Sequence, residues 1–125
     1  MVRPGDTLRI DVQVPHADVV LLQLVGDLDL LSAPALRRQV TRRVREHHHV
    51  VVDLAAVDFL SSVGLQTLLD AHCCAAEHMN RLHLTGTTHR PVARPLQLSG
   101  LDRVLNISEQ PATTLAARLA RTTPS

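Results

Sequence analysis

The sequence predicts an α/β fold in which a mixed, mostly parallel sheet of about five strands packs against about four helices. Runs rich in valine and leucine alternate along the chain with segments whose apolar residues recur at helical spacing. This alternation implies right-handed crossovers between parallel strands. The length of 125 residues fits one domain, and we expect that domain to span 1–125, with its core at about 8–119.

Two strands open the chain. Leu8, Ile10, Val12 and Val14 alternate with polar residues, which predicts a half-buried strand near an edge of the sheet. Residues 15–18 form a turn, and the apolar run 19–25 is typical of a strand buried on both sides, ended by Gly26 and Asp27. The short turn predicts a hairpin, so the first strand is the antiparallel member of the sheet.

The first helix follows Ser32, a favoured N-cap residue, with Pro34 in its first turn. Its apolar stripe is Leu36, Val40 and Val44. The opposite side is basic, with the residues Arg37, Arg38, Arg42, Arg43 and Arg45. An anion-binding patch is one reading, but we favour a solvated face because acidic residues elsewhere balance these charges.

A strand at 50–54 and a helix beginning near Ser62 come next. Ser61 or Ser62 can cap that helix, and Gly64 in its first turn lets another backbone approach closely. The predicted inward face has three- and four-residue spacing and consists of Leu65, Leu68, Leu69, His72, Cys73, Ala76 and Met79.

The last third of the chain predicts two more strands and two more helices. A strand at 81–85 leads through a polar loop to a short helix from Pro91 to Ser99, where Gly100 suits a left-handed C-terminal position. Pro95 should bend that helix. A last strand within 101–107 precedes a helix that starts at Ser108 and Pro111 and turns Leu115 and Leu119 inward.

Composition excludes several classes of function. The net charge is +1 and Phe59 is the only aromatic residue, which disfavours nucleic-acid binding. No apolar run reaches bilayer length and no export signal precedes the first strand, so we expect no membrane insertion and a cytoplasmic location.

The cysteine and histidine residues predict no metal site and no cofactor. Cys73 and Cys74 are adjacent on a predicted helix and are expected to be reduced packing residues. The run 47–49 is three histidines whose side chains cannot converge from an extended segment, so we interpret it as a linker. No glycine-rich phosphate loop with a lysine is present.

Three segments together resemble the STAS domain family of bacterial anti-sigma-factor antagonists and sulphate-transporter domains. They are residues 24–29 (LVGDLD), 59–65 (FLSSVGL) and 98–104 (LSGLDRV). The resemblance covers about 8–119. Antagonists of this family typically carry Asp-Ser-Ser-Gly or Asp-Ser-Thr-Gly at the helix start, and a partner kinase phosphorylates the hydroxyl after the Asp. That position is Ser62 here, preferred to Ser61; Ser61 replaces the Asp and Val63 replaces a small polar residue.

The resemblance implies an anti-sigma-factor antagonist that binds an anti-sigma factor, itself a serine kinase, when unphosphorylated and releases the sigma factor. Phosphorylation of Ser62 would switch it off, and a serine phosphatase would be a further partner. The expected contact surface lies at the carboxyl edge of the sheet and comprises Asp27, Asp29, Ser61, Ser62, Val63, Gly64, Leu65, Thr87 and Thr88. For Asp27 and Asp29, turn chemistry is an equally weighted role.

Three questions stay open at this point. An unphosphorylated STAS adaptor, serving a transporter or a signalling scaffold, is the alternative function, motivated by the missing Asp before Ser62. Monomer and dimer are both allowed. An enzyme is not expected, because a nucleophile elbow around Ser62 needs glycine where Leu60 stands.

Overall fold

The computed structural model describes residues 7–122. Its elements in chain order are β1 (Leu8–His16), β2 (Val19–Leu28), α1 (Ala33–Glu46), β3 (His49–Leu60), α2 (Ser62–Glu77), β4 (Arg81–Thr85), α3 (Arg90–Ser99), the 3₁₀ turn η1 (Leu101–Arg103) and α4 (Ala112–Thr122). The predicted alternation of strands and helices is confirmed.

The sheet is mixed and has the strand order β1-β2-β3-β4. β1 pairs antiparallel with β2, while β2, β3 and β4 are mutually parallel. The prediction of an antiparallel first strand at the sheet edge is confirmed. β1 is less buried than its alternation of apolar and polar residues predicted, because Val12 and Val14 are 36% and 51% exposed.

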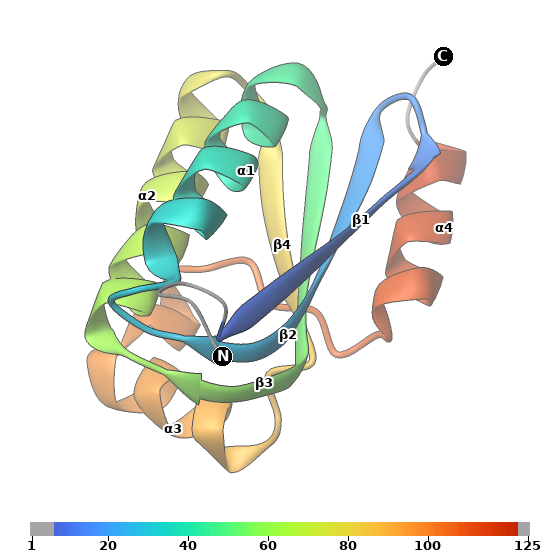
Figure 1. Ribbon diagram of the computed structural model, residues 1–125. Helices are drawn as coiled ribbons and strands as arrows, with labels where there is room; N and C mark the ends of the chain where they lie inside the picture. Colours follow the sequence, from blue (N-terminus) through green and yellow to red (C-terminus); the bar gives the residue numbers. More distant parts are fainter. Residues whose placement is uncertain (1–6, 123–125) are drawn as a thin grey trace.

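Helices cover the two faces of the sheet unequally. α1 and α2 lie side by side on one face, and α4 lies alone on the other (Figure 1). The larger core cluster joins α1, α2 and α3 to one face of β2–β4, with Leu22, Val52 and Leu68 fully buried. α4 buries Leu115 and Leu119 against Val19, Leu21 and Val51 on the opposite face. The predicted inward faces of α1 and α4 are therefore confirmed.

Two strands are longer than predicted. β2 does not end at Gly26 and Asp27 but continues to Leu28, and β3 runs to Leu60 instead of stopping at Leu54. The parallel ladder between them resumes after two register shifts and ends with Leu28 opposite Leu60. Gly26 has a φ of +115°, and a Cβ there would lie 2.1 Å from the carbonyl oxygen of Thr7, so the extension depends on glycine. Pairing across the sheet thus overrides the local turn signal.

A full fifth strand does not form within 101–107. Residues 101–103 instead form η1, and Ile107 makes one isolated parallel bridge to Leu84. The left-handed Gly100 ends α3, and Gly100 and Leu101 then accept the amides of Arg103 and Val104 within a tight turn. The bridge consists of two hydrogen bonds, from the Leu84 amide to the Asn106 carbonyl and from the Ser108 amide to the Leu84 carbonyl.

The buried side of α2 differs from the prediction in its second half. Leu65 and Leu68 are buried as expected, but the stripe continues through Ala71 and Ala75. Small residues let α2 pack closely against α1. The predicted continuation is wrong because Cys73, Ala76 and Met79 are exposed. Cys73 is accordingly a free, exposed thiol and not a packing residue.

The three-histidine run is only partly a linker. His47 and His48 connect α1 to the sheet, whereas His49 is the first residue of β3. Within residues 7–122, no helix is both long and apolar enough to cross a membrane.

Candidate functional site

The two adjacent serines occupy different structural positions at the junction of β3 and α2. Ser61 is the N-cap, with extended backbone, and its Oγ accepts a hydrogen bond from the amide of Gly64 at 3.1 Å. Its carbonyl accepts the amide of Leu65 at 2.9 Å. Ser62 is the first residue of α2 and its side chain is exposed. The hydroxyl that faces solvent is therefore that of Ser62, while Ser61 holds the helix start.

Gly64 is required here because of space and not because of backbone conformation. A Cβ on Gly64 would lie 2.7 Å from Leu28 Cγ, 3.0 Å from Leu60 Cδ1 and 3.1 Å from the carbonyl oxygen of Leu28. The amide of Ser61 also donates to that carbonyl, at 2.9 Å. The start of α2 is thus held directly against the end of β2, which brings the β2–α1 loop beside the serines, as Figure 1 shows.

The carboxylate of Asp29 organises the β2–α1 loop. It accepts the amides of Leu31 and Ser32, each at 3.0 Å, and the hydroxyl of Thr7 at 3.4 Å. The amide hydrogen bond from Ser32, followed by the other donors, lowers the pKa of Asp29 despite partial desolvation. Asp29 therefore performs the turn chemistry that was one of its two predicted roles.

Ser32 precedes α1 but does not cap it with its side chain. Its hydroxyl accepts the amide of Asp29 at 2.9 Å and donates to the carbonyl of Asp27 at 2.8 Å, so it closes the loop on itself. The Ser32 side chain is fully buried in this arrangement. Ser32 holds the predicted N-cap position, but its hydroxyl points back to β2 and bonds no helix amide.

The remaining predicted contact residues fall into two groups. Asp27 pairs with Phe59 across the ladder and lies at the serine turn, as does Val63, which is 37% exposed. Gly64 and Leu65 belong to the buried packing beneath that turn. Of the predicted contact residues at this turn, Ser62 and Val63 are exposed, and Asp27, Asp29 and Ser61 are partly exposed.

Thr87 and Thr88 lie in the loop between β4 and α3. β4 stops at Thr85 opposite Asp53, and the loop after it runs on beside β3: a Cβ on Gly86 would meet Ala55, and His89 Nε2 lies 2.7 Å from the carbonyl oxygen of Val57. Both threonines line a hollow with Gln97, Asp102 and Glu109. Their part in the contact surface around Ser62 stays a prediction.

Four exposed apolar side chains, three of them outside the predicted contact surface, lie on the segments that meet at the serine turn. We call the residues Leu30, Leu31, Phe59 and Val63 the apolar rim; the first three are 68%, 59% and 51% exposed. They come from the β2–α1 loop, the end of β3 and the start of α2. Exposed large apolar residues gathered at one place mark interaction surfaces. The sequence signal that could have revealed this surface is the pair Leu30 and Leu31, two apolar residues between the second strand and the first helix, where polar residues are usual.

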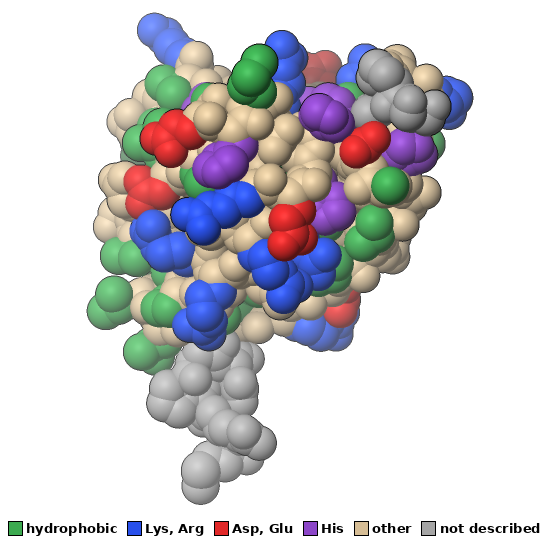
Figure 2. All heavy atoms as spheres, turned by 90° about the horizontal axis from the view of Figure 1, so that it is seen from above, with side chains coloured by type: hydrophobic (Ala, Val, Ile, Leu, Met, Phe, Trp, Pro, Cys, Tyr) green, Lys and Arg blue, Asp and Glu red, His purple; other side chains and the backbone are tan. Residues whose placement is uncertain are grey.

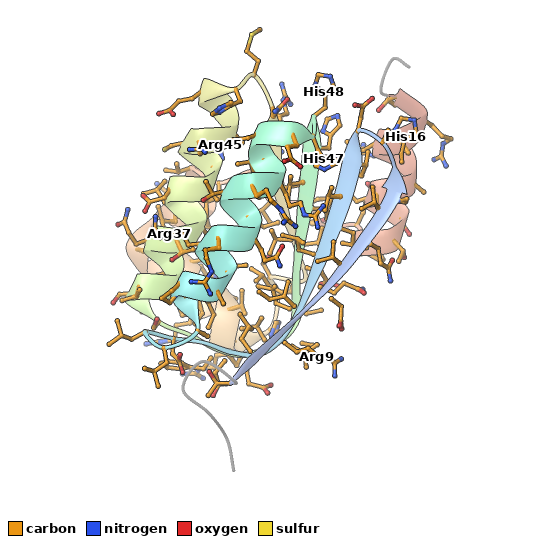
Figure 3. The ribbon with its side chains drawn as sticks, turned by 45° about the horizontal axis from the view of Figure 1, so that its top comes forward. Arg9, His16, Arg37, Arg45, His47 and His48 are labelled. Atoms are coloured by element: carbon orange, nitrogen blue, oxygen red, sulfur yellow. The ribbon has the colours of Figure 1, made fainter. Side chains whose placement is uncertain are left out.

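Four of the five arginines on α1 are solvated as expected, whereas Arg43 is partly buried and its Nε has no hydrogen-bond partner within residues 7–122. Arg37 pairs with Asp70 at 2.8 Å, and Arg38, Arg42 and Arg45 are exposed. Figure 3 shows Arg37 and Arg45 on α1, and Figure 2 shows acidic side chains among the basic ones at the end of the molecule seen from above. The described residues contain no group of three or more metal-ligating side chains. His47 instead bonds the carbonyl of Ala17 through Nδ1 at 2.8 Å.

The fold and the serine turn together define a STAS domain. A family model described as "Mlab, STAS domain" matches residues 3–107, and this chain belongs to that family. Its sequence is 31% identical over 105 residues to the anti-sigma-F factor antagonist RsfB of Mycobacterium tuberculosis, covering 82% of each protein. It is 26% identical over 97 residues to an anti-sigma-B factor antagonist of Staphylococcus epidermidis, covering 77% of this chain and 89% of that protein.

Solved structures agree with this assignment. The chain superimposes on an anti-sigma factor antagonist from Mycobacterium paratuberculosis with a TM-score of 0.76 and 27% identity, covering 90% of this chain and 96% of that one. Unphosphorylated SpoIIAA shares the fold, with a TM-score of 0.75 at 15% identity, covering 93% and 100% of the two chains.

Proposed function

We propose that this chain, acting in the cytoplasm as a single STAS domain, is an anti-sigma-factor antagonist that docks on its anti-sigma factor through the surface around Ser62. Relatives that carry this name cover most of its length. The observation that carries the proposal is an exposed Ser62 at the first position of α2, where the segments that carry the apolar rim meet. Such a surface can bury apolar area against a partner while the hydroxyl stays reachable in the free protein.

Phosphorylation of Ser62 by the same partner would then act as the off switch. The amides of Ser62 and Val63 have no hydrogen-bond acceptor within residues 7–122, so a phosphate there meets open donors and the positive end of the helix dipole. The fold should therefore tolerate a group of charge about −1.5 to −2.

The same phosphate would oppose docking. The rim side chains that must lose water on binding are apolar, and Asp27 adds a carboxylate beside them. Burying a phosphate among these groups costs several kcal/mol unless the partner supplies a cation. A cost of about 4 kcal/mol lowers affinity about a thousandfold, which is sufficient for a switch.

The test is incubation with the cognate anti-sigma kinase and ATP, followed by intact-mass analysis and a binding measurement. Ser62→Ala removes the proposed acceptor, and Ser61→Asn is the matched control because it removes the neighbouring hydroxyl and retains a capping oxygen. We expect phosphate on the wild type and on Ser61→Asn but none on Ser62→Ala.

Other outcomes assign other roles. Phosphate that is lost from Ser61→Asn and retained on Ser62→Ala would move the acceptor to Ser61. No phosphate on any protein, together with intact binding, would favour the unphosphorylated adaptor, which the presence of Ser61 in place of the family's Asp makes worth testing. No binding to any anti-sigma factor would refute the antagonist function. The proposed role needs no catalysis by this chain.

A further inference from the structure

A polar hollow lies on the face of the sheet that α4 covers, next to β4. It has a volume of about 580 Å³, and its polar lining includes His49, Arg81, His83, Ser108, Gln110 and Arg118. This volume lies in the range that small-molecule sites occupy. The hollow exists because α4 packs mainly over β1, β2 and β3, and residues 106–110 complete the wall beside β4.

The strand register explains which side chains face this hollow. His49 is opposite Arg81 and Val51 is opposite His83 in the β3–β4 ladder. Val51 packs beneath α4, and alternate residues of a strand share a face, so His49, Arg81 and His83 also point to the α4 side. The opposite faces of β3 and β4 supply the larger apolar core through Val50, Val52, Leu82 and Leu84.

Two neutral imidazoles form the floor of the hollow. His49 Nδ1 lies 2.9 Å from His83 Nε2, and Asn106 Nδ2 lies 2.8 Å from His83 Nδ1. With the Asn106 amide as donor, His83 Nδ1 accepts and Nε2–H donates to His49. Desolvation, followed by the nearby cationic groups, lowers the pKa of His83 to about 4, and desolvation also lowers the pKa of His49.

The charged groups around these rings are mostly cationic. Arg81 and Arg118 both act on His83, from β4 and α4 respectively, and Arg81 also acts on His49. Among the described residues, Glu109 is the one carboxylate that lines the hollow. The Oε1 atom of Gln110 is buried and has no hydrogen-bond partner within residues 7–122, so it can accept a donor from a guest molecule.

We propose that this hollow binds a small phosphorylated polyol, with Arg81 and Arg118 holding the phosphate and Ser108, Glu109 and Gln110 bonding the hydroxyl groups. Arginine forms strong, charge-assisted hydrogen bonds to phosphate oxygens. The hollow contains carboxylate and amide oxygens that accept from hydroxyls. The site lies at the His49 end of β3, whereas Ser62 follows the other end, so it does not depend on the proposed switch.

The experiment is an NMR titration of the full chain at neutral pH, following the imidazole signals of His49 and His83. Inorganic phosphate and glucose 6-phosphate are the probes, and sodium chloride at matched ionic strength is the blank. We expect saturable shifts with both phosphates and tighter binding of glucose 6-phosphate.

Arg118→Gln should weaken phosphate binding by about tenfold or more. Arg121→Gln is the matched control, because it removes the same charge from α4 at a residue outside the lining. Arg81→Gln serves as an independent second variant from β4. Shifts that sodium chloride reproduces, or equal weakening by Arg118→Gln and Arg121→Gln, would overturn the site. Equal affinity for the two phosphates would overturn the assigned hydroxyl contacts.

Discussion

Replacing Ser61 and Ser62 separately should affect stability very differently. Ser61→Ala removes the oxygen that accepts the Gly64 amide at 3.1 Å. Loss of an N-cap costs about 0.5–2 kcal/mol. Gly64 is buried, so water cannot readily replace that acceptor, and we expect the upper half of the range, about 1–2 kcal/mol. For a chain of this length, each kcal/mol lowers Tm by about 3–5 °C.

Two control variants test whether the loss of stability comes from the missing cap at Ser61. Ser62→Ala changes an exposed side chain and should alter the free energy of unfolding by less than about 0.5 kcal/mol. Ser61→Asn retains a capping oxygen and should also stay within about 0.5 kcal/mol of the wild type.

Urea unfolding followed by far-UV circular dichroism is the assay, since the chain contains no Trp or Tyr. The midpoint should fall for Ser61→Ala at an unchanged slope. A neutral Ser61→Ala, or an equal loss in Ser62→Ala, would show that the assigned roles of the two serines are wrong.

Three further predictions concern the rim, the loop and the histidines. Phe59→Ser should weaken binding to the anti-sigma factor by about tenfold or more in a calorimetric titration, with little change in Tm, because Phe59 is 51% exposed. Asp29→Ala should destabilise the fold by about 1–2 kcal/mol in urea unfolding, because two amides lose their acceptor; Asp29→Asn, which keeps an oxygen, should lose less. The pKa of His83 is lowered to about 4 from 6.5, so the unfolded chain binds the additional proton and stability should fall as pH decreases from about 6.5 to 4, by up to about 3 kcal/mol. The urea midpoint should depend less on pH across that window in His83→Gln, but not in His48→Gln, a change at an exposed side chain. If His83→Gln kept the pH dependence of the wild type, the assignment would be contradicted.

Local patterns were sufficient wherever a residue's role depends on its near neighbours. The stripe of Leu36, Val40 and Val44 and the left-handed Gly100 follow from helical period and backbone conformation, and both are present in the structure. The position of the serine turn between a buried strand and an amphipathic helix is likewise local. The resemblance to STAS domains came from such short segments, and the family match bears it out.

Only the tertiary structure decided which groups meet at the site. Whether β3 ends at Leu54 or at Leu60 depends on pairing with β2, and that ladder continues until Leu28 stands opposite Leu60. Both serines are chemically competent caps, and the contact of Gly64 with Leu28 and Leu60 settles that Ser61 turns inward. Hydrogen bonds and packing between residues distant in sequence carry no local pattern, because their free energy depends on register and close approach in the folded chain.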